Sequence, residues 1–405
     1  MRGTIGAMTL TRTALTLLVC AATAVGCATT APELVPATAA GTANELAVPA
    51  LSPAERGLVT SAEPFVGTGL SGQRILYRST SGIDGRGTEV SGTVFAPPGQ
   101  PPPDGWPVVT VGHPTTGLID ECAPSRAPDL LGSAGLVRDL LARGFVVTVT
   151  DYQGLGNPGP HPYLEPITAA YNLIDAVRAA RFLVPDTSPR WAAIGESQGG
   201  QASWAAAEQA AAYGDGLDFV GAASLSPPAD LSPVVADGPP VLDVPQQMFL
   251  PMLLDGLAVA HPDLDESNYI HGPLLENRDV LRTCTRDLVP EKVAIALSLT
   301  PADTAPNSNA DVERMRKWLT QDALPQRPAT APMLVVVSGR DVLIQPDWTV
   351  DAVDRACALG DTIELRYRAN DAHADSRALP GAIDWVAGRF AGAPIADTCA
   401  GAATP

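Results

Sequence analysis

The pentapeptide Gly195-Glu196-Ser197-Gln198-Gly199 is the most informative stretch of this sequence for the fold. It directly follows a short apolar stretch, residues 191–194, that is typical of a buried strand, and it precedes an alanine-rich helical pattern over residues 201–212. A G-x-S-x-G sequence between a strand and a helix is typical of a nucleophile elbow, a sharp turn that presents a serine. The glycines fit that turn, because a strained backbone leaves no room for neighbouring side chains. The alternative is a strand-to-helix turn in which Ser197 only caps the helix.

Strand-like and helix-like stretches alternate on both sides of the pentapeptide. Because parallel strands need crossover connections, usually helices, the alternation predicts an α/β fold with a mostly parallel sheet flanked by helices. Residues 229–330 interrupt the alternation with many prolines, and we expect them to form a cap or lid insertion between the two parts of the core, residues 61–228 and 331–405. Besides 191–194, the expected strands are residues 74–80, 89–96, 108–111, 145–150, 333–338 and 362–368, and the expected helices include residues 136–143, 167–183, 350–358 and 382–390.

The first sixty residues carry targeting signals instead of a core. Residues 1–27 combine two arginines, no acidic residue and an apolar run too short to span a bilayer, which predicts a signal peptide. The sequence Ala24-Val25-Gly26-Cys27 resembles the lipobox at which bacteria acylate the cysteine after cleavage, so Cys27 is the expected site of lipidation. Ordinary cleavage near Ala31 is the alternative. Residues 28–60, rich in alanine, threonine and proline at their start, are expected to form a tether.

The composition excludes several classes of protein. The 405 residues are 45% hydrophobic and 17% charged, which is enough apolar content for a globular core. The net charge of −18 leaves no basic surface for phosphates, so we expect no binding of nucleic acid. Residues 154–159 match G-x-G-x-x-G, but Pro158 and Pro160 stand where a dinucleotide-binding helix would begin. A structured loop near the active site is the better interpretation.

A serine nucleophile needs a base, and in proteins with such an elbow the acid and then the histidine follow the serine along the chain. His373 fits this order, because it lies in the loop directly after the last expected strand. His261 and His271 fall within the expected insertion, where we expect packed or exposed polar residues, with a place in the substrate pocket as the alternative.

The expected acid is Asp341, which follows the strand 333–338 closely. Functional loops of open α/β sheets gather at the carboxyl ends of the strands, so this position favours Asp341. Asp347 and Asp371 are the competing carboxylates, and a turn-capping role is the alternative for Asp341.

Four cysteines follow Cys27, and their even number in an exported protein indicates two disulfides with three pairings open. None of the spacings is C-x-x-C and the five histidines do not cluster, so we expect no metal site. The four are Cys122, Cys284, Cys357 and Cys399.

With these residues assembled, the chain resembles the secretory lipase family of α/β-hydrolases, the family of the fungal lipase A type, over residues 60–400. The resemblance implies an α/β-hydrolase fold with a cap after the sixth strand, ester hydrolysis without a cofactor, and disulfides that pair Cys122 with Cys284 and Cys357 with Cys399. It rests on the stretches GHPTTGL (112–118), CAPS (122–125) and DYQG (151–154), the Ser197 elbow, Asp341 and His373.

The function predicted from these residues is that of an exported serine carboxylic-ester hydrolase, a lipase or an esterase, either secreted or held at the cell envelope as a lipoprotein. Ser197 would attack the ester carbonyl, His373 would take its proton and Asp341 would orient the imidazole. The expected partner is a small-molecule or lipid ester, with membrane contact through a lipid anchor; no cofactor is expected. Acyl transfer on the same triad is the runner-up, followed by a serine peptidase and a non-catalytic binding protein.

An oxyanion hole is expected from the backbone N–H of Gln198 and a second donor in the loop 113–116. Many members of the family have glycine in place of Pro114, which has no N–H to donate. The amide or hydroxyl of Thr115 is therefore the expected second donor, with Thr116 less favoured. The alternative is that both threonines only satisfy a tight turn.

Overall fold

The computed structural model describes residues 50–236 and 238–401. The expected signal peptide, its Cys27 and most of the expected tether lie outside these residues. Within the described residues, no helix is both long enough and apolar enough to cross a membrane.

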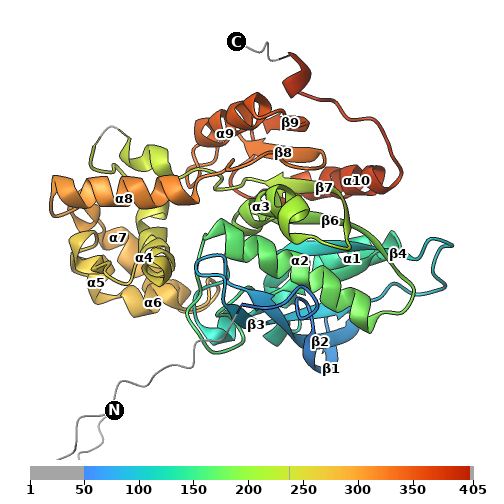
Figure 1. Cartoon of the computed structure of the whole chain (residues 1–405). Helices are drawn as coiled ribbons and strands as arrows, with labels where there is room; N and C mark the ends of the chain where they lie inside the picture. The colour runs from blue at the N-terminus through green and yellow to red at the C-terminus, as the bar shows by residue number, and fades with distance from the viewer. Residues whose placement is uncertain (1–49, 237, 402–405) are drawn as a thin grey trace, which may run out of the picture. The chain divides into compact units, whose positions relative to one another are not determined.

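The described residues form a nine-stranded sheet in the order β1-β2-β3-β5-β4-β6-β7-β8-β9. Its first three strands pair antiparallel, as does β3 with β5, whereas all pairs among β4 to β9 are parallel. The sheet is thus mixed but mostly parallel, and the predicted α/β fold is confirmed (Figure 1). The strands are β1 (Val59–Gly67), β2 (Leu70–Thr80), β3 (Gly87–Phe95), β4 (Trp106–Gly112), β5 (Val146–Thr150), β6 (Thr187–Glu196), β7 (Asp218–Leu225), β8 (Met333–Ser338) and β9 (Ile363–Arg368).

Helices pack on both faces of the sheet and bury two hydrophobic clusters. One cluster contains residues of α2 (Pro166–Leu183), α3 (Gln198–Tyr213) and α9 (Pro346–Ala358), and the other contains residues of α1 (Ala134–Ala142) and α10 (Leu379–Phe390). Successive strand residues alternate between the clusters: Val108 belongs to the first and Val109 to the second. Because both faces are covered, the central strands are continuous apolar runs in the sequence.

Between β7 and β8 the described residues contain five α-helices, which Figure 1 shows grouped together. They enclose a hydrophobic cluster of their own, which includes the buried residues Leu254, Ile270 and Met315. We call residues 226–332 the helical segment. The resemblance implies an insertion after the sixth strand; in this chain the segment follows the seventh, because the antiparallel edge strand β1 adds one. The helices are α4 (Val244–Ala260), α5 (Gly272–Glu276), α6 (Arg278–Arg282), α7 (Val289–Ser298) and α8 (Asn309–Asp322).

Two disulfides connect distant parts of the chain. Cys122–Cys284 joins the loop after β4 to the helical segment, and Cys357–Cys399 joins α9 to the short 3-10 helix η8 (Cys399–Gly401). These are the two pairings that the family resemblance implies.

Candidate active site

Ser197 lies in the turn between β6 and α3, in a backbone conformation that residues other than glycine rarely adopt. The strand ends at Glu196 and the helix begins at Gln198, whereas Ser197 between them has φ 53° and ψ −119°. Its backbone N–H donates to the carbonyl oxygen of Leu225 at the end of β7, at 2.8 Å. The serine therefore has the strand-turn-helix setting that the sequence predicts.

Close backbone packing explains the glycines of the pentapeptide. A Cβ atom on Gly195 would lie 2.3 Å from the carbonyl oxygen of Gly199, and one on Gly199 would lie 1.9 Å from that of Gly112. Both distances are far shorter than any tolerated contact, so a side chain at either position would push β4 away from the elbow. The absence of a side chain at both glycines thus allows the turn after β6 to pack directly against the end of β4.

His373 contacts both Ser197 and Asp341. Its Nε2 atom lies 2.9 Å from Oγ of Ser197, and its Nδ1 atom lies 2.6 Å from Oδ2 of Asp341. An ionised carboxylate only accepts hydrogen bonds, so Nδ1 carries a proton and the lone pair of Nε2 faces the serine hydroxyl. The other oxygen of Asp341 accepts the N–H groups of Leu343 and Ile344, both at 2.9 Å, which fixes the carboxylate.

The two competing carboxylates have other surroundings. Asp371 binds the guanidinium groups of Arg368 and Arg377. Asp347 is exposed in the first turn of α9. The structure therefore brings Asp341, and neither competitor, into hydrogen-bond contact with His373.

The histidines of the helical segment lie away from this site. His261 stacks on Trp318, with ring centroids 5.0 Å apart, and Nε2 of His271 donates to the carbonyl oxygen of Ala305 at 2.8 Å. Neither is among the described residues that line the pocket at Ser197. Within the described residues, no group of three or more His, Cys, Asp or Glu side chains could hold a metal ion.

Ser226, a residue that sequence reasoning missed, connects the loops of His373 and Asp341. It follows β7 with a left-handed φ of 44°. Its Oγ atom accepts the N–H of Ala374, next to His373, at 3.3 Å and lies 3.0 Å from the hydroxyl of Ser338 at the end of β8. A serine after a strand is too common in loops to have revealed this contact in the sequence.

Glu196, which directly precedes Ser197, lies close enough to His373 for their charges to interact. Burial raises the pKa of Glu196 to about 7, and the charge of His373 opposes this rise. Its Oε1 atom has no hydrogen-bond partner among the described residues. The side chain lines a cleft shared with Pro114 and Arg286, distinct from the pocket that contains Ser197.

The predicted oxyanion donors lie at the first residue of α3 and in the loop after β4. Gln198 is the first residue of α3, so its N–H is one of the helix N–H groups without a partner in the helix. Oγ1 of Thr115 lies 2.7 Å from the phenolic oxygen of Tyr163. Thr116 is buried, and its hydroxyl has no partner among the described residues.

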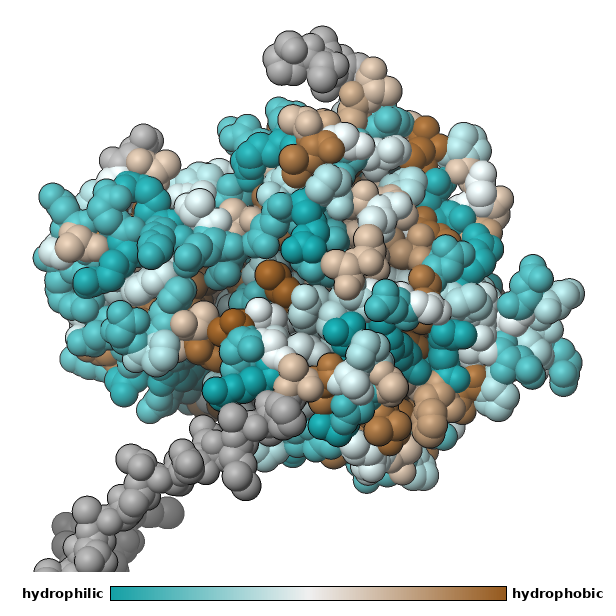
Figure 2. Space-filling view, in the orientation of Figure 1, coloured by the Kyte–Doolittle hydropathy of each residue, from teal (hydrophilic) through white to brown (hydrophobic). Residues whose placement is uncertain are grey.

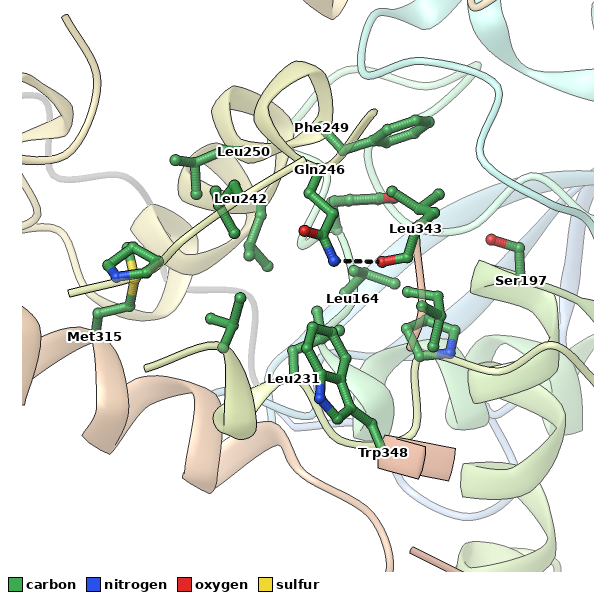
Figure 3. A pocket seen from close by; sticks show the side chains of 16 residues that line it. Leu164, Ser197, Leu231, Leu242, Gln246, Phe249, Leu250, Met315, Leu343 and Trp348 are labelled. Carbon is green, nitrogen blue, oxygen red and sulfur yellow. Dashed lines mark hydrogen bonds between the residues drawn. The ribbon is translucent and has the colours of Figure 1, made fainter. Parts of the chain in front are cut away.

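An apolar pocket extends from Ser197 into the helical segment (Figure 3). Ser197 lies at one end and Met315 of α8 at the other. Gln246 of α4 donates its side-chain N–H to the carbonyl oxygen of Leu343 at 3.1 Å, which joins the helical segment to the loop of Asp341. By contrast, the face of the molecule in Figure 2 is mostly hydrophilic. The remaining lining residues are Tyr163, Leu164, Pro228, Leu231, Val234, Pro240, Leu242, Phe249, Leu250, Leu253, Ile344 and Trp348.

Comparison with known proteins gives matches to one family. A family model described as secretory lipase matches residues 133–398. A Mycobacterium tuberculosis protein described as a probable inactive lipase is 26% identical over 346 residues, which cover 80% of this chain and 74% of that protein.

Two solved structures share the fold. Candida antarctica lipase A superposes with a TM-score of 0.67 at 17% identity, covering 85% of this chain and 84% of that chain. The rice cell wall degrading esterase LipA from Xanthomonas oryzae superposes with a TM-score of 0.64 at 20% identity, covering 80% of this chain and 92% of that chain.

Proposed function

The chain belongs to the secretory lipase family, and on this premise we propose that it is an exported serine hydrolase that cleaves carboxylic esters. The observation that carries the proposal is the continuous series of hydrogen bonds from Ser197 through His373 to Asp341. The apolar pocket that begins at Ser197 supports an ester with an apolar acyl chain as the substrate.

The proposed reaction proceeds through an acyl-enzyme. Ser197 attacks the ester carbonyl while Nε2 of His373 accepts the hydroxyl proton, and the same nitrogen then protonates the leaving alcohol. Asp341 holds the imidazole in the tautomer that makes this transfer possible. A water molecule activated by His373 next attacks the acyl carbonyl and regenerates Ser197. The N–H of Gln198 and a group of Thr115 stabilise the oxyanion in both steps.

Family membership alone does not imply catalysis, because one relative of this chain is described as a probable inactive lipase. Catalysis by this chain is supported by its own three side chains, whose contacts are those that acyl transfer requires. The strained backbone at Ser197 supports the same role, since strain of this kind clusters at functional sites.

The proposal extends to the organisation and location of the chain. We assign the core to residues 61–228 and 331–405 and the cap to residues 229–330, with the acyl pocket between them. The signal peptide, residues 1–27, and the tether, residues 28–60, would place the enzyme outside the cytoplasm, with Cys27 as a lipid anchor. Partitioning into detergent tests the anchor: Cys27→Ala should release the protein from the detergent phase, and an N-terminus at residue 32 in the untreated protein would overturn it.

A p-nitrophenyl ester series from C2 to C16 tests the function. The wild type should hydrolyse these esters and react with a fluorophosphonate probe, whereas Ser197→Ala should do neither. Ser71→Ala, an exposed serine in β2, is the matched control and should retain both. Adding a primary alcohol and measuring ester formation separates hydrolysis from acyl transfer. Labelling or hydrolysis that persists in Ser197→Ala would overturn the proposal.

A further inference from the structure

The loop between β5 and α2 contains the tripeptide His161-Pro162-Tyr163, whose two aromatic rings contact Gln198 and Thr115, the two residues expected to form the oxyanion hole. Nε2 of His161 lies 3.0 Å from the side-chain nitrogen of Gln198. The phenolic oxygen of Tyr163 lies 2.7 Å from Oγ1 of Thr115. Both rings are buried. One short segment thus binds the side chains of both residues expected to supply the oxyanion donors.

The contacts of His161 determine its tautomer. Its Nδ1 atom lies 2.7 Å from the carbonyl oxygen of Gln153, and since a carbonyl only accepts, Nδ1 carries the proton. Nε2 then offers a lone pair to the amide of Gln198. Burial lowers the pKa of His161 to about 4, so the ring stays neutral and keeps accepting this bond at neutral pH.

Tyr163 remains a hydroxyl under the same conditions. Burial raises the pKa of Tyr163 to about 12, so its proton is available for the bond to Thr115. When Tyr163 donates to Oγ1 of Thr115, the threonine proton is free to point elsewhere. In that direction the contact orients Thr115 and leaves its hydroxyl proton free for another acceptor.

The segment is held firmly enough to act as a support. The N–H of Tyr163 donates to the carbonyl oxygen of His161 at 2.8 Å. Glu165 then caps α2 by accepting the N–H groups of Ile167 and Thr168, at 3.0 and 2.8 Å. Gly154 packs against the segment so closely that a Cβ atom there would lie 2.4 Å from the nitrogen of His161.

From these contacts we propose that His161 and Tyr163 are positioning residues. They fix the two expected oxyanion donors, at Gln198 and Thr115, in position relative to each other. The proposal rests on the proposed ester hydrolysis. His161 fixes Gln198, and thereby the first turn of α3, while Tyr163 fixes the loop of Thr115. Removing either contact should destabilise the transition state more than the complex with the bound ester, because the oxyanion exists only in the transition state.

Steady-state kinetics with p-nitrophenyl butyrate test this role. Tyr163→Phe and His161→Phe keep a ring but remove the polar atoms, and each should lower kcat by about tenfold with KM within about twofold, a smaller loss than deleting an oxyanion donor outright. Both should also weaken inhibition by butylboronic acid, which forms a tetrahedral adduct on the serine, by a similar factor. Tyr171→Phe and His261→Phe are matched controls outside the site and should change neither value.

A double-mutant cycle separates positioning from general destabilisation. If Tyr163 acts through Thr115, the loss in kcat for Tyr163→Phe with Thr115→Val should be clearly smaller than the product of the two single losses. Normal turnover in both Tyr163→Phe and His161→Phe would overturn the inference. It would also be overturned if kcat fell and KM rose by the same factor while Tm decreased, because that pattern indicates general destabilisation. In either case an inactive Ser197→Ala variant would leave the proposed hydrolysis standing, whereas an active one would overturn the function itself.

Discussion

Nε2 of His373 lies 2.9 Å from Oγ of Ser197, although 176 residues separate them along the chain. The contact forms because β6, β8 and β9 are parallel strands of one sheet, so the loops after them meet at the same edge. Asp341 follows β8 at that edge and completes the series.

Asp341→Asn should lower kcat by about 10³ to 10⁴ with little change in KM, because an amide nitrogen facing Nδ1 of His373 favours the wrong tautomer. The oxygen of the new amide can still accept the N–H groups of Leu343 and Ile344, so we expect the fold to persist. Kinetics and Tm check both points. Asp347→Asn is the matched control and should retain activity. Loss of activity in Asp347→Asn but not in Asp341→Asn would instead assign the orientation of His373 to Asp347.

Met315→Trp should shorten the far end of the pocket. Hydrolysis of C12 to C16 esters should fall more than about tenfold in kcat/KM, while C2 to C4 esters, which do not reach α8, should change less than about twofold. Met315→Ala should spare the long esters and serves as the control. An equal loss at every chain length would show that Met315 does not limit the acyl chain.

Removing the disulfides should destabilise the protein unequally. In the loop-entropy model, Cys122–Cys284, with a sequence separation of 162, contributes about 5 kcal/mol, and Cys357–Cys399, with a separation of 42, contributes about 4 kcal/mol. Paired cysteine-to-serine variants compared by urea unfolding check the order. A larger loss for the Cys357 and Cys399 pair would contradict it, and peptide mapping without reductant checks the pairing.

Asp322→Asn should stabilise the protein increasingly as the pH rises from 5 to 8. Burial raises the pKa of Asp322 to about 8, and the charge of Glu165 adds to the rise, whereas the unfolded chain has an ordinary aspartate pKa of about 3.9. The folded state binds this proton more tightly than the unfolded chain does. The contribution of Asp322 to the free energy of unfolding of the wild type is therefore highest at low pH and falls as the pH approaches 8, by at most about 1.4 kcal/mol per pH unit.

Free energies of unfolding for wild type and Asp322→Asn at several pH values measure this difference. Asp351→Asn changes an exposed carboxyl on α9 and should show a difference that does not vary with pH. A constant difference for Asp322→Asn as well would contradict the prediction.

Local features of the sequence were sufficient for much of the core and for the elbow. β6 and α3 flank Ser197 as predicted, because the apolar run favours a strand, the two glycines permit a sharp turn and the alanine-rich stretch favours a helix, each within a few residues. β1 and β7 were missed. β1 contains Pro64 and mostly exposed residues, and β7 is rich in Ala, Gly and Ser, so in β7 the strand conformation comes from pairing with β6 and β8 and not from its own propensity.

The α/β fold, the elbow at Ser197 and a short set of partners for Ser197 could therefore be predicted from the sequence, since these depend on local patterns and on chain order. The contact between Asp341 and His373, and those of Tyr163 with Thr115 and His161 with Gln198, follow from the three-dimensional arrangement of the loops. A hydrogen bond requires two atoms within about 3 Å of each other. Residues from different loops reach that distance only when the sheet has brought the ends of its strands together.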